Sequence, residues 1–416
     1  MKRSKKLISV LLVFLMVTLL ITGCSKEEQK LYGLMKEMSS LEASQQNGEI
    51  SLDINQLPEE FLEEAASQLG FSLEMLQNYS IIYEMKQDTQ TMNAELVLSI
   101  YDKVNKEQIP FITSMSDGDM VYVKVDDMIN FIKTVTKDDL AKEQLTYLFG
   151  DAQYISMTNE EIIDFYIELL PASSEAEKQI LKNTLSQSLD KESVLKQREE
   201  VMSFISPLMG KIAKTYDGFE TSLVTEEDNK LILSVGTVEI FDVVKGFVNY
   251  SIDHADEVAV LLKEIVPAYL EYTQKQMHQV FVAQGMEEEI EEMDIQMDDI
   301  AIEINSKIDE FAEMVNGNEE EYKAMVAMFI DMASEEVKAA TGDSALNITL
   351  EKIGDATYTT VVDLKVDAEQ EQVAFNLNVT ETTKSINSFK ITKPTQNVMA
   401  GDVYFEKIQD IMAEIE

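Results

Sequence analysis

Cysteine, histidine and tryptophan are nearly missing from this sequence of 416 residues, which has one Cys, two His and no Trp. Because Cys24 is the only thiol, no disulfide forms within the chain, and the fold has to be stabilised by packing. His254 and His278 lack the H-E-x-x-H spacing of a zinc site, so we interpret both as ordinary surface or core residues. We therefore expect no metal site and no cofactor.

Basic side chains are also scarce, since 34 of them face 77 acidic ones and give a net charge of -43. Such a surface repels nucleic acid and other polyanions, which we exclude as partners of the folded part. It suits cationic partners or divalent ions, but solubility alone accounts for it, and we favour that interpretation.

The sequence contains no G-x-S-x-G elbow, no P-loop and no dinucleotide-binding fingerprint. The protein is therefore not expected to be an enzyme. A hydrolase that uses paired carboxylates is the remaining catalytic alternative, because 77 acids make accidental pairs certain. Without Trp, a sugar-stacking platform would have to be built from Tyr alone.

The N-terminus has the pattern of a secretory signal. A basic start is followed by an apolar run over 7–21, which predicts a signal peptide at 1–23. Ile21, Thr22, Gly23 and Cys24 resemble the lipobox of bacterial lipoproteins. That resemblance implies cleavage after Gly23 and a diacylglyceryl group on Cys24. An ordinary signal-anchor helix is the alternative, although the run is short for a span of about 20 residues.

Two acyl chains are enough for durable membrane anchoring. We therefore expect a protein of the cell membrane, lipid-anchored on the extracytoplasmic face. Residues 25–30 are polar and predict a short tether, and no second apolar run approaches spanning length.

The rest of the chain alternates strand and helix patterns. A hairpin is expected at 116–119, where Asp-Gly favours a tight turn, and a capping box at 158–161. Strands are expected at 49–54, 80–86, 92–101, 109–115, 120–125, 152–157, 219–225, 230–235, 345–352, 357–366, 372–381 and, as a further strand of the last meander, 386–391. Helices are expected at 31–41, 58–77, 126–135, 137–149, from 158, at 173–214, over 237–340 with interruptions near 267, 285 and 316–318, and at 402–414.

Grouped antiparallel strands with helices between them predict an α+β fold. A large sheet with one apolar face has to be covered, and the long helices are the available cover. We expect a lipidated tether and first helix at 24–44 and one large α+β domain at 45–416. Two similar halves, 45–215 and 216–416, are the alternative.

The lipobox, the strand-rich pattern and the Asp-Gly-Asp-Met turn and strand at 117–120 resemble Gram-positive lipoproteins of uncharacterised role. At the level of topology, the chain is also similar to the lipid-carrier lipoproteins that include LolA, LppX and LprG. That similarity implies a large curved antiparallel β-sheet, an unclosed half-barrel, with amphipathic helices packed on the concave face, where several of these proteins carry acyl chains. It transfers no binding residue.

An apolar stripe runs along 290–314 at steps of three and four and continues on the next helix. Methionine is flexible and polarisable, so such a face suits the lining of an acyl-chain groove. The alternative is a helix packed on the sheet with Met as filler. The candidate lining residues are Met293, Met297, Ile300, Ile304, Met325, Met328 and Phe329.

These observations predict a non-enzymatic, membrane-anchored extracytoplasmic lipoprotein that binds a hydrophobic or lipid ligand. The alternative is a structural or partner-binding envelope protein without a small-molecule ligand.

Overall fold

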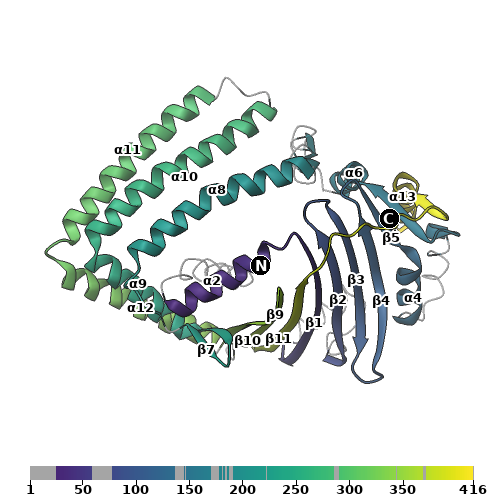
Figure 1. Cartoon of the computed structure of the whole chain (residues 1–416), viewed down its shortest axis with the longest axis horizontal. Helices are drawn as coiled ribbons and strands as arrows, with labels where there is room; N and C mark the ends of the chain where they lie inside the picture. The colour runs from purple at the N-terminus through teal and green to yellow at the C-terminus, as the bar shows by residue number, and fades with distance from the viewer. Residues whose placement is uncertain are drawn as a thin grey trace.

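The fold comes from a computed structural model of the whole chain (Figure 1). It describes residues 25–58, 77–135, 145, 147–169, 178–179, 181–182, 185–186, 191–221, 223–284, 290–342, 344–368 and 372–415. The helix expected at 58–77 lies almost wholly outside these residues, as do most of the helix expected at 137–149 and the first part of the one at 173–214.

Strands from both ends of the chain form one curved, unclosed sheet, so the α+β prediction is confirmed. Within the described residues the order is β12-β6-β5-β4-β3-β2-β1-β11-β10-β9-β8-β7. Strands near residue 50 therefore pair directly with strands near residue 380. The strands are β1 (Ala43–Gln56), β2 (Tyr79–Asp88), β3 (Asn93–Asp102), β4 (Glu107–Ser116), β5 (Met120–Lys124), β6 (Tyr154–Thr158), β7 (Val224–Glu227), β8 (Lys230–Gly236), β9 (Ala345–Gly354), β10 (Thr357–Ala368), β11 (Val373–Ser385) and β12 (Val398–Ala400).

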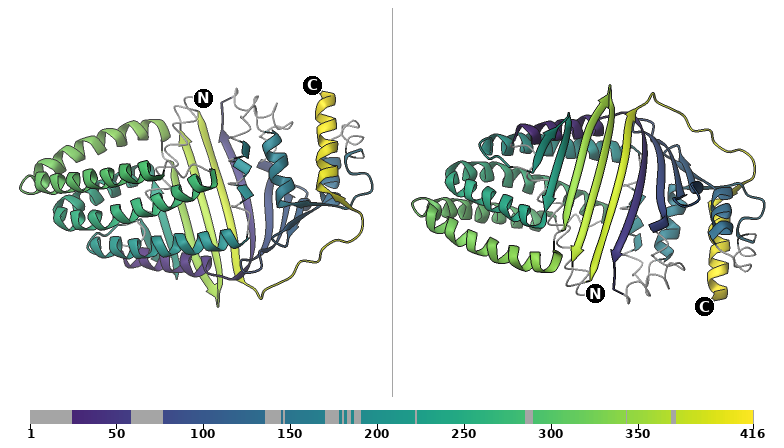
Figure 2. Two further views of the ribbon diagram at one scale, coloured as in Figure 1. Left: turned by 90° about the horizontal axis from the view of Figure 1, so that it is seen from above. Right: turned by 90° about the horizontal axis from the view of Figure 1, so that it is seen from below.

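Helices cover the two ends of this sheet (Figures 1 and 2). At the β7–β9 end, α2, α9 and α10 bury a core that includes Leu31, Val243 and Leu350. At the other end, α4 packs on β4 and α13 packs on β6. The described helices are α2 (Lys26–Ser39), α4 (Val125–Val135), α6 (Asn159–Leu169), α8 (Lys191–Thr215), α9 (Thr237–Asp253), α10 (Ala255–Gln284), α11 (Ile290–Val315), α12 (Glu319–Thr341) and α13 (Gly401–Ile415).

Two short-range predictions are confirmed at atomic detail. Gly118 has φ +92 in the turn between β4 and β5, a backbone conformation that glycine adopts without strain. At the start of α6, the Thr158 hydroxyl accepts the Glu161 N–H at 3.1 Å and the Glu161 carboxylate accepts the Thr158 N–H at 2.6 Å. The expected capping box is therefore present.

The strand expected at 386–391 is wrong. Residues 386–395 take no regular structure and lead from β11 to the opposite edge of the sheet, where β12 pairs in parallel with β6. A parallel partner needs such a crossover, whereas a fourth meander strand would need a tight turn after Ser385. The sheet is therefore mixed, not wholly antiparallel.

The interruption expected near Pro267 is also wrong, because α10 runs straight through this residue. Proline removes one helical hydrogen bond, and packing of Leu261 and Val266 with the neighbouring helices offsets that loss. The chain breaks instead at His254, whose N–H donates to the Tyr250 carbonyl at 3.0 Å as the cap of α9. The interruption expected at 316–318 is confirmed between α11 and α12.

Candidate functional site

The lipobox residues Ile21, Thr22, Gly23 and Cys24 lie outside the described residues, so acylation stays a prediction. The description begins at Ser25, which is the N-cap of α2. The Ser25 hydroxyl accepts the Glu28 N–H at 3.1 Å, and the Glu28 carboxylate accepts the Ser25 N–H at 2.8 Å. Regular structure therefore starts directly after the predicted anchor.

The tether expected at 25–30 is wrong, because these residues form the cap and first turn of α2. Glu28 is fully buried and accepts a hydrogen bond from Thr221, and Leu31 is 2% exposed in the main core. The run has the composition of a linker because most of its side chains are polar and face solvent. Its buried side consists of residues one turn apart, such as Glu28 and Leu31, which a short window does not show. Ser25-x-x-Glu28 is itself a helix-start signal.

One face of the sheet is apolar across nine adjacent strands. On this face, residues that pair directly across the strands form an unbroken aliphatic row. The neighbouring residue on eight of these strands points to the other face, and these residues form a polar row. The aliphatic row is Val224, Leu233, Ile348, Val362, Val379, Ile50, Ile81, Ile100 and Ile109. The polar row is Ser234, Asn347, Asp363, Asn378, Ser51, Ser80, Tyr101 and Gln108. Alternation of this kind separates an apolar face from a polar one, although Ser80 in the polar row is itself buried.

Helix packing on the apolar face is uneven. The helices that bury Leu233 and Leu350 lie at the β7–β9 end. No described helix packs extensively on β1, β2, β3 or β11, and Ile81 on β2 is 41% exposed. The central part of the aliphatic row therefore presents apolar side chains that the described helices leave uncovered.

A polar cluster interrupts this central region. Gly48 on β1 pairs with Tyr83 on one side and Glu381 on the other. The missing side chain lets the Tyr83 ring lie over β1, because a Cβ at position 48 would be 2.3 Å from the ring. The Tyr83 hydroxyl donates to the Glu381 carboxylate across the intervening strand, and the Thr383 hydroxyl donates to the same carboxylate at 2.7 Å.

The environment of Tyr83 keeps its phenol neutral. Burial raises the pKa of Tyr83 well above its usual value near 10, and the hydrogen bond and negative charge of Glu381 raise it further. Neutral phenol and carboxylate thus form a donor–acceptor pair inside an apolar surface. Ligand sites commonly combine a mostly apolar lining with a few such polar groups that orient the ligand.

The sequence alone does not reveal this cluster. Tyr83 and Glu381 are far apart in the chain, and neither stands in a motif. The available signal was Gly48 inside a run of strand-forming residues, since an isolated strand glycine indicates close approach by another group.

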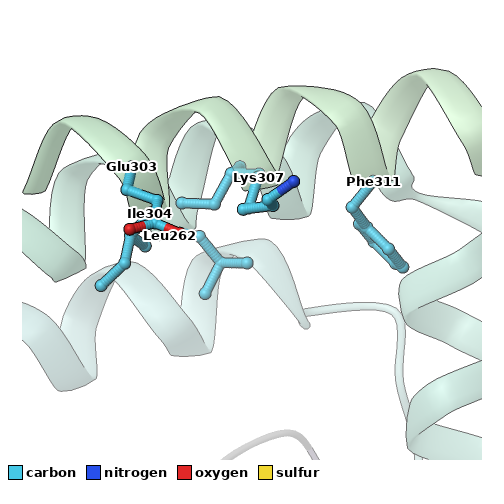
Figure 3. Close-up of a pocket in the computed structure, with 6 residues that line it drawn as sticks. Leu262, Glu303, Ile304, Lys307 and Phe311 are labelled. Carbon is cyan, nitrogen blue, oxygen red and sulfur yellow. The ribbon is translucent and has the colours of Figure 1, made fainter. Parts of the chain in front are cut away.

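The structure separates the predicted lining residues into two groups, neither of which packs on the sheet centre. Ile304 lines an apolar cleft of about 270 Å³ between α10 and α11, together with Leu262 and Phe311 (Figure 3). Ile300 on α11 is exposed, and Met297 is partly buried. For Met293 only the helical backbone is described. This cleft falls below the 300–1,000 Å³ typical of ligand pockets.

Met325, Met328 and Phe329 lie on α12 and are all exposed, as is Met332. The opposite side of α12 packs against α9. These residues therefore form an apolar surface strip on α12, separate from the sheet.

A second groove, of about 630 Å³, lies between α2 and the β7–β8 hairpin. Charged side chains, Lys30, Lys36, Glu37 and Glu226, make up much of its wall, and Lys30 forms an ion pair with Glu226. The lining is mixed, because the apolar side chains of Leu34 and Leu231 contribute alongside the charged ones.

Within the described residues, no helix is both long and apolar enough to span a bilayer. In the same part of the chain, no three or more His, Cys, Asp or Glu side chains come together as a metal site. Comparison of the chain with protein-family models, curated proteins and solved structures gives no match.

Proposed function

We propose that this protein is a non-enzymatic lipoprotein, anchored through Cys24 to the extracytoplasmic face of the cell membrane, that holds an apolar ligand of the lipid class. The observation that carries the ligand part is the centre of the aliphatic row on β1, β2, β3 and β11, which the described helices leave uncovered. Soluble proteins rarely expose large contiguous apolar surfaces unless something binds there.

The polar cluster of Tyr83, Glu381 and Thr383 would fix the orientation of a ligand on this surface. An acyl chain would lie along the aliphatic row, and a polar headgroup that donates hydrogen bonds would meet the Glu381 carboxylate. Two acyl chains on Cys24 would keep the protein at the membrane that supplies such ligands.

The test is lipid analysis of the protein purified from its host membrane. Native mass spectrometry is expected to find a bound apolar molecule in addition to the covalent lipid. Ile81→Asp places a charge within the aliphatic row and is expected to abolish that binding. The matched control is Val104→Asp, because Val104 is 70% exposed in the β3–β4 turn and its substitution should leave binding intact. Native protein without a bound molecule, together with no uptake of a fluorescent phospholipid, would overturn the ligand proposal.

A second candidate function is binding of an envelope protein, and the exposed strip on α12 favours it. Met-rich surfaces adapt to varied apolar partners. A photo-crosslinking residue in place of Phe329, which is 57% exposed, is expected to capture one discrete partner in host cells. The same residue in place of the exposed Lys338, on the other side of α12, serves as the control. Absence of a specific crosslink from position 329 argues against this function.

A further inference from the structure

Helix α2 is fixed to the body of the protein at its first turn. The reciprocal hydrogen bonds of Ser25 and Glu28 close that turn, and Glu28 also accepts from Thr221 beyond the end of α8. Leu31, one turn later, is 2% exposed in the main core. The residue that follows Cys24 is thus part of the rigid fold.

This arrangement leaves no flexible linker between an acylated Cys24 and the globular body. Consecutive Cα atoms are about 3.8 Å apart, and each residue of an extended linker would add at most about 3.6 Å. A lipoprotein with a long linker can stand away from the bilayer in any orientation. Here the bilayer surface has to lie against the part of the body that surrounds the start of α2.

The outward face of α2 is unlike the rest of the surface. Its exposed residues include Lys26, Gln29, Tyr32, Gly33 and Lys36, with Met35 at the edge, and Gly33 and Lys36 also border the groove beside the β7–β8 hairpin. Glu28 is buried and Glu27 lies on the core side of the helix, while the one exposed acid, Glu37, forms an ion pair with Lys352 at 2.5 Å. Lys26 and Lys36 form no ion pair with any described residue. In a chain of net charge -43, this is a surface that an anionic membrane does not repel.

The side chains on this face are those that favour a bilayer interface. Tyr places an apolar ring among the headgroups with its hydroxyl toward water, and Lys extends its ammonium to the phosphates. Tyr32 is 37% exposed and Met35 is 51% exposed, so both side chains are available for contact.

We propose that the outward face of α2 lies in the headgroup layer of the membrane, and that this contact fixes the orientation of the whole protein. The occupant of this face is a phospholipid bilayer. The inference rests on the proposed lipid anchor and adds to it a defined membrane-facing surface.

The test uses an environment-sensitive fluorophore on an introduced cysteine in the lipidated, full-length protein. The thiol of Cys24 is consumed by the lipid, so Tyr32→Cys supplies the only free thiol. Ile302→Cys is the control, because Ile302 is 70% exposed on α11, which lies at the outer edge of the helical layer, away from α2 (Figures 1 and 2). Met35→Cys is a second reporter in case the substitution at 32 disturbs folding.

The protein is reconstituted in vesicles of phosphatidylcholine and phosphatidylglycerol that contain spin-labelled lipid. We expect the spin label to quench most of the emission from position 32 or 35 and to leave that from position 302 unchanged. Lys26→Glu combined with Lys36→Glu is expected to reduce the quenching while the protein still floats with the vesicles.

Two outcomes overturn the proposal, and they differ. Protein that floats with the vesicles but is not quenched at positions 32 and 35 refutes the membrane-facing surface and leaves the anchor intact. Lipidation-competent protein that fails to float refutes the anchor and the orientation together.

Discussion

Tyr83 on β2 and Glu381 on β11 meet across β1, with the Tyr83 hydroxyl donating to the Glu381 carboxylate above Gly48. The pair therefore joins the first strands of the chain to the last ones. It also places a fixed acceptor next to the aliphatic row. Three predictions follow from the local geometry of these three residues.

Removal of the Tyr83 hydroxyl is expected to destabilise the fold. Tyr83→Phe leaves the Glu381 carboxylate without one of its donors in a partly buried site, and we expect the free energy of unfolding to fall by roughly 1–2 kcal/mol. Tyr101→Phe is the control on the polar face of the sheet, where the loss should stay below about 0.5 kcal/mol. Urea denaturation followed by circular dichroism measures both. Equal values for the two variants would show that the pair contributes no net stability.

The raised pKa of Tyr83 predicts a loss of stability at alkaline pH. Above about pH 10 the unfolded chain ionises this phenol while the folded protein keeps it neutral, so folding becomes less favourable as pH rises. The difference between the ultraviolet phenolate titrations of the wild type and Tyr83→Phe isolates this one group. Its midpoint is expected well above the usual phenol value near 10. A midpoint near 10 would contradict the buried, hydrogen-bonded environment.

Gly48 is expected to be coupled energetically to Tyr83. An alanine Cβ would lie 2.3 Å from the Tyr83 ring, so Gly48→Ala must displace the ring and break its contact with Glu381. We expect a loss of about 1–3 kcal/mol. In a Tyr83→Ala background the clash is gone, and the same substitution should be neutral or stabilising, since alanine costs less than glycine in a strand. Additive effects in this double-mutant cycle would rule out the coupling.

Local signals explain which elements the sequence reveals. The turn at Gly118 and the cap at Thr158 are specified by residues within four positions of each other, and both are present as expected. The strands of the last meander alternate clearly because one face is apolar and the other polar.

The pairing of strands that are distant in the chain explains which features could not be predicted from the sequence. Nothing near Ile50 shows that its neighbours are Val379 and Ile81, so neither the aliphatic row nor the Tyr83 and Glu381 pair was visible before the strands were placed. The apolar stripe on α11 is a true helical pattern, but its packing partner differs from the one expected. Its period shows that one side of the helix is apolar, but not whether the partner is a sheet, another helix or a ligand.

A polar contact between α10 and α11 is expected to weaken in acid. Asp294 accepts from Gln274 at 2.6 Å and contacts His278 Nε2 at 2.6 Å, and these two interactions, that with Gln274 first, lower the pKa of its carboxyl. The stabilisation is present above about pH 4, the usual Asp range, and is lost as pH falls through the lowered pKa. Asp294→Ala is expected to speed hydrogen exchange of α10 and α11 near this contact at neutral pH.

Asp299→Ala provides the control for that variant, because Asp299 is exposed on the same helix and makes no hydrogen bond with described residues. Exchange rates of the wild type and Asp294→Ala should converge on acidification. Equal rates at neutral pH would show that the contact does not hold the two helices together.

Glu28 is expected to matter far more than its neighbour Glu27. Glu28→Ala leaves the Ser25 amide and the Thr221 hydroxyl without their acceptor in a fully buried site, and we expect a loss of roughly 2–3 kcal/mol. Glu27→Ala should change the free energy of unfolding by less than about 0.5 kcal/mol. Glu28→Gln keeps the shape and one acceptor oxygen, so it should fall between them. If Glu28→Ala is as stable as the wild type, burial of Leu31 alone fixes α2, and the first turn is free to unwind into the linker that its composition suggests.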